Sequence, residues 1–374
     1  MSKTKVRFFA AVLCAFFLTG CGKASDEIEL VRVWERDDKA ADETGGDAAA
    51  EGLSDAWKIG IVTDDTEDAA LSDDSFKQSA KDGLSNLEAA YGIQTAVANT
   101  GSEQKFSEGF KKLISEGCNL CWGIGYNSAD ALLESAKTEP DKNFAIIDFG
   151  FEEAPENVTG VMFRAQEPSF LVGYIAGSVT GSGKVGFIGG ERSATIDQFQ
   201  YGFEAGVQYA AKTYSKQTEV LVEYADSFSD DEKAEGLADA MYAEGCDIIY
   251  HAAGGAGLGV IRSAEKNGKF VIGVDKDQSY LAPANVLTSA LKKVDVAIER
   301  VSLSFVRQEP IGGKTLSFGL TEGAVGIPTE HENFRDEVYD ATLLIEDKIK
   351  SGAIVPPDSK EAYDIFLDDL NQEQ

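Results

Sequence analysis

The sequence predicts an α/β protein built of two lobes, each with a parallel sheet covered by helices. From Trp57 onward, short apolar runs rich in β-branched residues alternate with amphipathic stretches of helical length. The apolar runs are continuous, which is typical of strands buried on both faces of a parallel sheet. Once a leader and a polar segment are set aside, about 315 residues remain, more than one hydrophobic core usually serves.

The expected elements follow this alternation in chain order. Strands are predicted at 58–62, 121–124, 144–148, 160–163, 185–188, 219–224, 248–251 and 270–274. Helices are predicted at 75–91, 104–116, 129–139, 170–180, 194–211, 231–244 and 258–267. In parallel sheets, ligands bind beyond the carboxyl ends of the strands, where loops enter the next helices. The binding site is therefore expected in those loops.

The first 20 residues have the order of an export signal peptide. Lys3, Lys5 and Arg7 precede an apolar run from Phe8 to Leu18, which is too short to cross a bilayer about 30 Å thick as a permanent helix. The following Thr-Gly-Cys21 completes the pattern read by lipoprotein-processing enzymes. Cys21 is therefore expected to carry lipid and to anchor the chain to the membrane. A plain secreted protein with a chance cysteine is the alternative.

Residues 21–56 are expected to form a flexible acidic tether. The segment is rich in Asp, Glu, Ala and Gly, and it cannot bury enough apolar surface to offset the entropy of ordering. Its one apolar patch, from Ile28 to Trp34, is too short to build a domain. The tether would space the folded body from the extracytoplasmic face of the cell membrane.

The formal net charge of −30 restricts the partners of the protein. Binding to nucleic acid needs clustered Lys and Arg, so nucleic acid is excluded as a partner. Docking of the body onto anionic lipid is disfavoured for the same reason. Most of the carboxylates are expected to form a solvated acidic surface.

Three cysteines remain beyond the signal and the lipidation site: Cys118, Cys121 and Cys246. The first two have the C-x-x-C spacing of redox and metal sites. No second pair follows, however, and the chain has only two histidines, His251 and His331. Small buried residues, or one disulfide of an exported protein, are therefore expected in place of a redox or zinc site. No metal and no cofactor are expected.

Aromatic and acidic residues stand in the loops where a ligand is expected. Phe76 and Phe228 lie in polar, helix-initiating loops, where a large apolar side chain would otherwise prefer the core. Stacking on a base contributes about 1 to 3 kcal/mol per ring, and packing under the loop is the alternative. Asp275 ends an apolar strand, so its carboxylate can accept bonds from vicinal hydroxyls or cap the next turn. Asp277 could do either.

A glycine cluster from Gly254 to Gly259 raises phosphate binding as an alternative, because successive backbone amides at a helix start can hold an anion. The spacing is not G-x-G-x-x-G, and Gly313-Lys-Thr315 lacks the upstream glycine of a P-loop. The acidic loops nearby would repel a polyphosphate. Serine catalysis finds no support either, because no G-x-S-x-G occurs.

Several motifs between about Lys58 and Glu330 are together highly specific. They are Asp74-Ser-Phe-Lys-Gln78, Phe163-Arg-Ala-Gln-Glu167, Phe170-Leu-Val-Gly-Tyr-Ile-Ala-Gly177, Lys184-Val-Gly-Phe-Ile-Gly-Gly190, Ile272-Gly-Val-Asp-Lys-Asp-Gln278 and Asn285-Val-Leu-Thr-Ser-Ala-Leu-Lys292. With these motifs the chain resembles the basic membrane protein family of solute-binding lipoproteins, which serve nucleoside import and include purine nucleoside receptors.

The resemblance implies a type I periplasmic-binding-protein fold, with two Rossmann-like lobes joined by a hinge of three crossing strands. The N-terminal lobe would comprise residues 57–163 plus 288–318, and the C-terminal lobe residues 164–287 plus 319–374. The crossings would fall near residues 163–166, 288–292 and 319–323.

The resemblance also implies the roles of the binding residues. Phe76 and Phe228 would sandwich the base, Asp275 would hold the ribose hydroxyls, and Lys292 would reach the ribose side. The same cleft would be lined by Asp74, Gln78, Gly254 and Gly255. Two residues depart from the family pattern and bear on the polar contacts to the base. Lys77 stands where Asn is usual, and Asn127 where an apolar residue is expected.

The implied function is capture of nucleosides, purine nucleosides above all, by hinge closure and delivery to the permease of an ABC importer. The chain would act as a monomer and leave its ligand chemically unchanged. A receptor of the same fold that signals to another protein is one alternative. A calcium-dependent nucleoside hydrolase is another, suggested by the acidic run Asp64-Asp-Thr-Glu-Asp68 with Asp73-Asp74. The spacing does not match that of the hydrolases, and no second acidic ligand loop is apparent.

Overall fold

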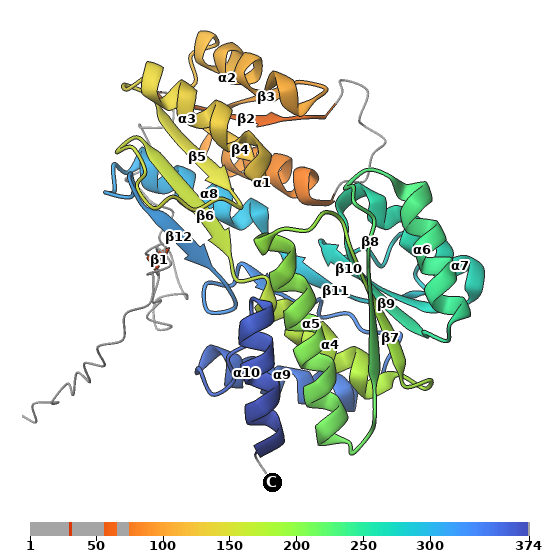
Figure 1. Ribbon diagram of the computed structural model, residues 1–374. Coiled ribbons are helices and arrows are strands. Elements are labelled where there is room, and N and C mark those ends of the chain that lie inside the picture. Colours follow the sequence, from red (N-terminus) through yellow and green to blue (C-terminus); the bar gives the residue numbers. More distant parts are fainter. Residues whose placement is uncertain (1–29, 32–55, 66–74, 373–374) are drawn as a thin grey trace, which may run out of the picture.

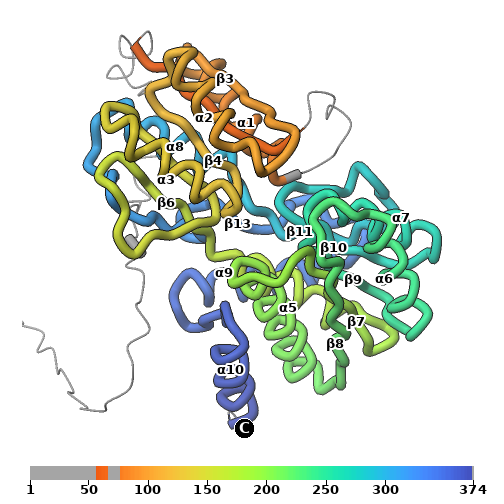
Figure 2. Tube along the Cα trace, turned by 45° about the horizontal axis from the view of Figure 1, so that its top comes forward, coloured from red at the N-terminus to blue at the C-terminus, as the bar shows by residue number. Residues whose placement is uncertain are grey.

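The computed structural model describes residues 30–31, 56–65 and 75–372, which form two α/β lobes (Figures 1 and 2). The strands are β1 Leu30–Val31, β2 Lys58–Thr63, β3 Gln94–Asn99, β4 Leu120–Ile124, β5 Asn143–Ile147, β6 Val158–Phe163, β7 Lys184–Gly189, β8 Glu219–Tyr224, β9 Ile248–Ala252, β10 Phe270–Asp275, β11 Val286–Lys292, β12 Thr315–Phe318 and β13 Val325–Gly326. The α-helices are α1 Ser75–Tyr91, α2 Phe106–Ser115, α3 Ala129–Thr138, α4 Gln166–Val179, α5 Ala194–Thr213, α6 Asp231–Ala243, α7 Gly257–Asn267, α8 Val294–Val306, α9 Asp336–Lys350 and α10 Lys360–Gln372. Three short turns are 3-10 helical: η3 Glu103–Lys105, η4 Tyr126–Ser128 and η5 Gly254–Ala256.

The first lobe is a parallel sheet in the order β1-β12-β6-β5-β4-β2-β3, with helices on both faces. Along β2, Ile59 and Ile61 are buried in a core shared with α1 and α8. Gly60 points to the other face, where a Cβ would lie 2.8 Å from Leu113 of α2. A continuous apolar strand is needed here because both of its faces are covered.

The second lobe has the strand order β13-β11-β10-β9-β7-β8. Its pairs are parallel except for β11 with β13, which is antiparallel. Helices α4 and α5 pack on one face and α6 and α7 on the other, each pair with its own buried apolar cluster. Two lobes with separately covered sheets confirm the fold class predicted from the sequence.

Glycines bring α4 and α5 into close contact. A Cβ on Gly173 of α4 would lie 2.2 Å from the backbone oxygen of Phe203. On α5, a Cβ on Gly206 would lie 2.1 Å from the backbone oxygen of Phe170. No side chain larger than hydrogen fits at these two positions, which explains why position 173 in the motif from Phe170 to Gly177 is glycine.

The chain crosses between the lobes three times, as expected. It leaves the first sheet after Phe163 to enter α4, returns after Lys292 to enter α8, and leaves again after Phe318 to reach β13. Residues 288–292, which we expected in the first lobe, belong to β11 of the second sheet. The second crossing therefore follows Lys292.

A partly buried guanidinium ties two of the crossings together. Arg164, just after β6, donates from Nε to Glu167 at 2.7 Å and from Nη1 to Ser317 of β12 at 3.0 Å. It also pairs with Glu322, which lies between β12 and β13. The Glu322 carboxylate in turn accepts a bond from the Gly319 amide at 2.7 Å. The network fixes the start of α4 against the third crossing.

Several elements were not expected from the sequence. The edge strand β3 is one, and α8, α9 and α10 are others. Residues 30–31 lie inside the segment expected to be a tether, yet they form β1 and pair in parallel with β12. Cys118, Cys121 and Cys246 are buried free thiols, which agrees with the expectation of small buried residues, and the alternative of a disulfide is not found among them. Within the described residues, no helix has the length and apolar character that a membrane span requires.

Candidate functional site

A cavity of about 480 Å³ lies between the lobes, within the usual size range of small-molecule sites. Its lining comes from the carboxyl ends of strands and the following loops, as parallel sheets predict. The lining residues are Asp64, Asp65, Phe76, Lys77, Glu103, Phe106, Ile124, Gly125, Tyr126, Asn127, Asp148, Glu191, Thr195, Ile196, Phe199, Ser227, Phe228, Ser229, Asp231, Ala252, Gly254, Gly255, Leu258, Val274, Asp275 and Lys292.

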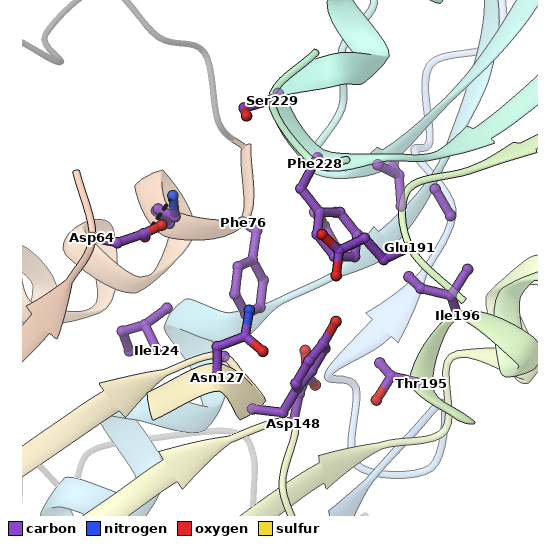
Figure 3. Close-up of a pocket in the computed structure, with 18 of the residues that line it drawn as sticks. Asp64, Phe76, Ile124, Asn127, Asp148, Glu191, Thr195, Ile196, Phe228 and Ser229 are labelled. Atoms are coloured by element: carbon purple, nitrogen blue, oxygen red, sulfur yellow. Dashed lines mark ion pairs between the residues drawn. The ribbon is translucent and has the colours of Figure 1, made fainter. Parts of the chain in front are cut away.

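Phe76 and Phe228 enter this cavity from different lobes. Phe76 stands in the first turn of α1, and Phe228 stands in the loop between β8 and α6. Figure 3 shows the two rings on opposite sides of the pocket. Both side chains are partly buried, so each presents an apolar face to the cavity. A flat ligand between them would meet an aromatic surface on each side.

Two glycines, Gly190 and Gly254, lie against the Phe228 side chain. A Cβ on Gly190 would lie 2.4 Å from the ring, so the ring packs directly on the backbone at that point. Gly254 has a φ of +54°, and a Cβ there would lie 3.5 Å from the Cβ of Phe228. The Phe228 carbonyl accepts a bond from the amide of Ala256 at 2.9 Å, which ties its loop to η5. Glycine at these positions thus supports an aromatic residue, and a phosphate need not be invoked.

Asp275 ends β10 with its backbone in the left-handed region, at a φ of +66°. Non-glycine residues adopt this conformation rarely, and it tends to occur at functional sites. The turn is fixed from behind by Gln278, whose Oε1 accepts from the Val274 amide at 3.0 Å and lies 3.1 Å from Nε2 of His251. Asp277 takes the capping role, accepting from the amide of Ser279 at 3.0 Å.

His251 supports this turn as a neutral side chain. Burial lowers the pKa of its imidazole to about 4, although the hydrogen bond with Gln278 acts in the opposite direction. At neutral pH, Nε2 can therefore donate to the Gln278 amide oxygen. Gly257 makes room for the ring, because a Cβ there would lie 2.2 Å from it.

Lys292 ends β11 at the floor of the cavity. Its ammonium lies 2.5 Å from the carboxylate of Asp148, which follows β5 in the other lobe. It also lies 4.6 Å from the centre of the Phe76 ring and 5.8 Å from that of Phe199. Asp148 has a φ of +63°, so its backbone is in the same left-handed region as that of Asp275. The ion pair and the aromatic faces compensate the cost of burying the ammonium.

Lys77, which stands where the family usually has Asn, forms ion pairs with two nearby carboxylates. Its ammonium lies 2.8 Å from the carboxylate of Asp64 and 3.3 Å from that of Asp65. Asn127, the second departure, donates from Nδ2 to Glu103 at 2.5 Å. These side chains all line the cavity on the side of the first lobe.

The cavity is acidic overall. Seven Asp and Glu side chains line it against two Lys side chains, and both ammonium groups are paired with carboxylates. A phosphate group would be repelled by such a lining. Among the described residues, no group of three or more Asp, Glu, His or Cys side chains could hold a metal ion. Asp65 instead pairs with Lys81 at 2.6 Å as well as with Lys77.

The structure brings together six of the eight binding residues expected from the sequence. Phe76, Phe228, Gly254, Gly255, Asp275 and Lys292 line one cavity. Asp74 lies outside the described residues. Gln78 is exposed and does not line the cavity; its amide donates to Asp82 at 2.8 Å. Residues two positions apart on a helix are separated by about 200° of rotation around its axis. Gln78 therefore faces away from the cleft when Phe76 faces it.

Sequence reasoning missed Asp148 as a cavity residue. It also missed Tyr126 and Glu191, which line the same cavity. Burial, and next the charge of Glu191, raise the pKa of the Tyr126 phenol, whereas a hydrogen bond with Ser193 lowers it. Asp148 ends an expected strand in the same way as Asp275, and that shared position was the available signal.

A family model described as an ABC transporter substrate-binding protein, PnrA-like, matches residues 61–360. The chain belongs to this family. Members of this family are substrate-binding proteins of ABC transporters, which implies a small-molecule ligand and a permease as partner.

Individual relatives agree with this assignment. Basic membrane protein A of Borreliella afzelii is 37% identical over 315 residues, covering 83% of this chain and 94% of that protein. A solved ABC transporter solute-binding protein of Aeropyrum pernix K1 superposes with a TM-score of 0.73 at 22% identity, covering 84% of this chain and 97% of the other. One from Conexibacter woesei DSM 14684 gives 0.65 at 18% identity, covering 81% and 99%. At such identities the two structures support the fold alone.

Proposed function

We propose that this substrate-binding protein captures nucleosides, above all purine nucleosides, between its lobes and delivers them to the permease of an ABC importer. The observation that carries the proposal is the pair of rings, Phe76 and Phe228, which line one cavity from opposite lobes. Stacking of a base on an aromatic ring contributes about 1 to 3 kcal/mol, so two rings could supply much of a micromolar affinity.

The polar floor of the cavity fits a pentose. The Asp275 carboxylate would accept charge-assisted bonds from vicinal hydroxyls, and the Lys292 ammonium would donate to the ribose oxygens. Gly254 and Gly255 would border the base from the second lobe. The acidic lining supports a nucleoside over a nucleotide, because a phosphate would meet carboxylates that outnumber the paired ammonium groups.

Hinge closure would couple binding to delivery. Within the described ranges 56–65 and 75–372, the two sheets are connected by only three segments of the chain, at 163–166, 292–294 and 318–325. A ligand in contact with Phe76 and Phe228 at once favours a closed arrangement, because the open one cannot make both contacts. The permease would then recognise the closed shape.

The chain would act as a monomer with lobes at residues 57–163 plus 293–318 and 164–292 plus 319–374, because β11 ends at Lys292 in the second sheet. It would be held on the extracytoplasmic face of the cell membrane by lipid on Cys21, after removal of residues 1–20. Cys21 and residues 1–20 lie outside the described residues. Labelling with radioactive palmitate tests the anchor: label on the wild-type chain and none on Cys21→Ala is expected, and label on both would contradict it.

Uptake of labelled nucleoside by cells lacking this protein tests the transport role. We expect uptake at low nucleoside concentration to fall several-fold and to recover when the wild-type gene is restored. Unchanged uptake, together with loss of a cellular response to nucleosides, would favour a receptor of the same fold.

A further inference from the structure

An ion pair joins the two lobes outside the binding cavity. The ammonium of Lys276 lies 2.6 Å from the Asp82 carboxylate. Asp82 belongs to α1 of the first lobe, and Lys276 follows β10 of the second lobe. Gln78 donates to the other oxygen of Asp82 at 2.8 Å, which orients the carboxylate toward the second lobe.

The pair is connected to the site through both of its elements. Lys276 is the residue after Asp275, whose backbone is held in the left-handed region. Asp82 stands on the same helix as Phe76, less than two turns further along. Neither Lys276 nor Asp82 lines the cavity, so neither is placed to touch a ligand there.

We infer that Lys276 and Asp82 are positioning residues that increase ligand affinity by favouring the arrangement in which the lobes meet. The inference rests on the proposed capture of a ligand between the lobes. Separation of the lobes would break this ion pair, and a contact made in only one of two states shifts the population toward that state. On this inference the exposed Gln78 also has a role, because its hydrogen bond holds the Asp82 carboxylate in place.

The expected effect is modest because both side chains are partly in water, with 38% and 39% of their surface exposed. Exposed pairs of this kind change an equilibrium by about two- to fivefold, and reversal of one charge adds repulsion to the lost attraction. A single reversal should therefore weaken ligand binding by about three- to tenfold.

Charge reversal and charge exchange in the full chain test the inference. Lys276→Asp and Asp82→Lys are each expected to weaken guanosine binding in calorimetry by about three- to tenfold. The double variant restores opposite charges with the partners exchanged, so its affinity should return to within about twofold of wild type. At about 1 M salt, where the screening length is about 3 Å, the differences should shrink.

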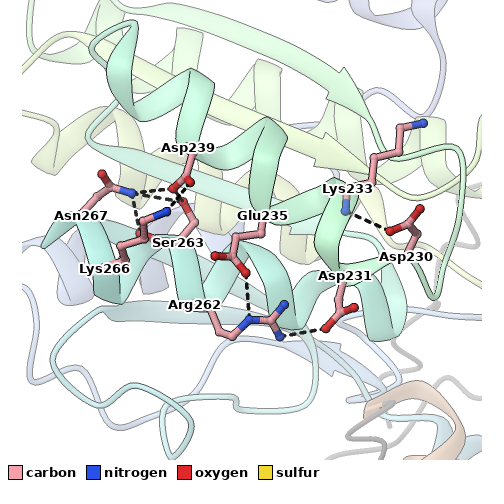
Figure 4. Close-up of polar contacts among 9 residues, drawn as sticks. All are labelled: Asp230, Asp231, Lys233, Glu235, Asp239, Arg262, Ser263, Lys266 and Asn267. Atoms are coloured by element: carbon pink, nitrogen blue, oxygen red, sulfur yellow. Dashed lines mark hydrogen bonds and ion pairs between the residues drawn. The ribbon is translucent and has the colours of Figure 1, made fainter.

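A matched control is available inside the second lobe. Lys266 of α7 and Asp239 of α6 are also 2.6 Å apart and also solvent-exposed, but both belong to one lobe (Figure 4). Lys266→Asp should leave guanosine affinity unchanged, because separation of the lobes does not break this pair.

A second readout does not depend on the ligand. Spin labels on cysteines introduced at the exposed positions Lys137 in the first lobe and Glu244 in the second report the distance between the lobes. Lys276→Asp should shift the distance distribution toward longer values before any nucleoside is added. This readout separates the inference from the proposed function: if wild type binds no nucleoside, the proposed function fails while the distances still decide the role of the pair.

Two results would overturn the inference. One is that the single reversals leave both affinity and the distance distribution equal to those of Lys266→Asp. The other is that exchange of the charges fails to restore what each single reversal removed, since a structural disturbance and not the ion pair would then explain the loss.

Discussion

The Lys292 ammonium and the Asp148 carboxylate come from different lobes and lie 2.5 Å apart, with only 3% and 9% of their side-chain surfaces exposed. Two charges buried at the floor of the cavity depend on each other, because removal of one leaves the other desolvated and unpaired. The pair therefore contributes to the junction of the lobes as well as to the polarity of the site.

Breaking this pair should destabilise the fold. Lys292→Met leaves Asp148 buried without its cation, and the free energy of unfolding should fall by about 3 to 5 kcal/mol. Most of this loss should be recovered in Lys292→Met with Asp148→Asn, which removes both charges. Urea denaturation measures these free energies of unfolding.

The control is Lys360→Met, which breaks an exposed ion pair of the same kind, between Lys360 and Asp364 of α10 at 2.5 Å. This change should lower the free energy of unfolding by less than about 1 kcal/mol. Equal losses at the two sites would contradict the account.

The aromatic pair should dominate nucleoside affinity. Phe76→Ala and Phe228→Ala each remove one stacking face, so the dissociation constant should rise about tenfold or more, equivalent to about 1.4 kcal/mol. Calorimetric titration with guanosine and adenosine checks this. Tyr280→Ala removes an exposed ring of the second lobe that lies outside the cavity, and it should bind as wild type does. Unchanged binding in both Phe variants would remove them from the site.

Gly190 should matter through Phe228. A Cβ at Gly190 would lie 2.4 Å from that ring, so Gly190→Ala must displace the ring and should weaken nucleoside binding about tenfold. Gly236 on α6 has no atom within 4 Å of the equivalent position, so Gly236→Ala should retain full affinity. It should also add about 0.5 to 1 kcal/mol of stability, because alanine favours a helix over glycine. Full affinity in Gly190→Ala would show that the ring is not needed where it stands.

His251 should make stability depend on pH in a known direction. Burial lowers its pKa from about 6.5 to about 4. Between these values the unfolded chain binds a proton that the folded chain does not, so this group lowers stability as the pH falls, by about 1.4 kcal/mol per pH unit. His251→Asn cannot titrate. The stability gap between wild type and this variant should therefore narrow from pH 7 to pH 5 in urea denaturation, whereas a constant gap would show no such linkage.

Periodicity sufficed for the elements whose strands are buried on both faces. The apolar runs ending at Ile124, Phe163 and Val274 all became strands of parallel sheets. The edge strand β3 was missed because Gln94–Asn99 carries no long apolar run and buries only Ala98 fully. Pattern alone also gave no boundary for α8, whose register depends on its packing against α1.

The site was predictable where a single residue type stood out in its loop. Phe76, Phe228 and Asp275 are of this kind, and all three line the cavity. Asp148 was missed because its importance comes from Lys292, which is distant in sequence and adjacent only after folding. Gln78 was placed in the cleft by motif, although helical geometry turns it toward Asp82.

Calorimetric titration of the purified protein against a panel of nucleosides, free bases and sugars tests the central claim most directly. Capture between paired rings and an acidic floor predicts tight binding of purine nucleosides, and clearly weaker binding of free bases and ribose, because each fragment engages only part of the cavity. Tight binding of a sugar or another solute, with no heat from any nucleoside, would contradict it.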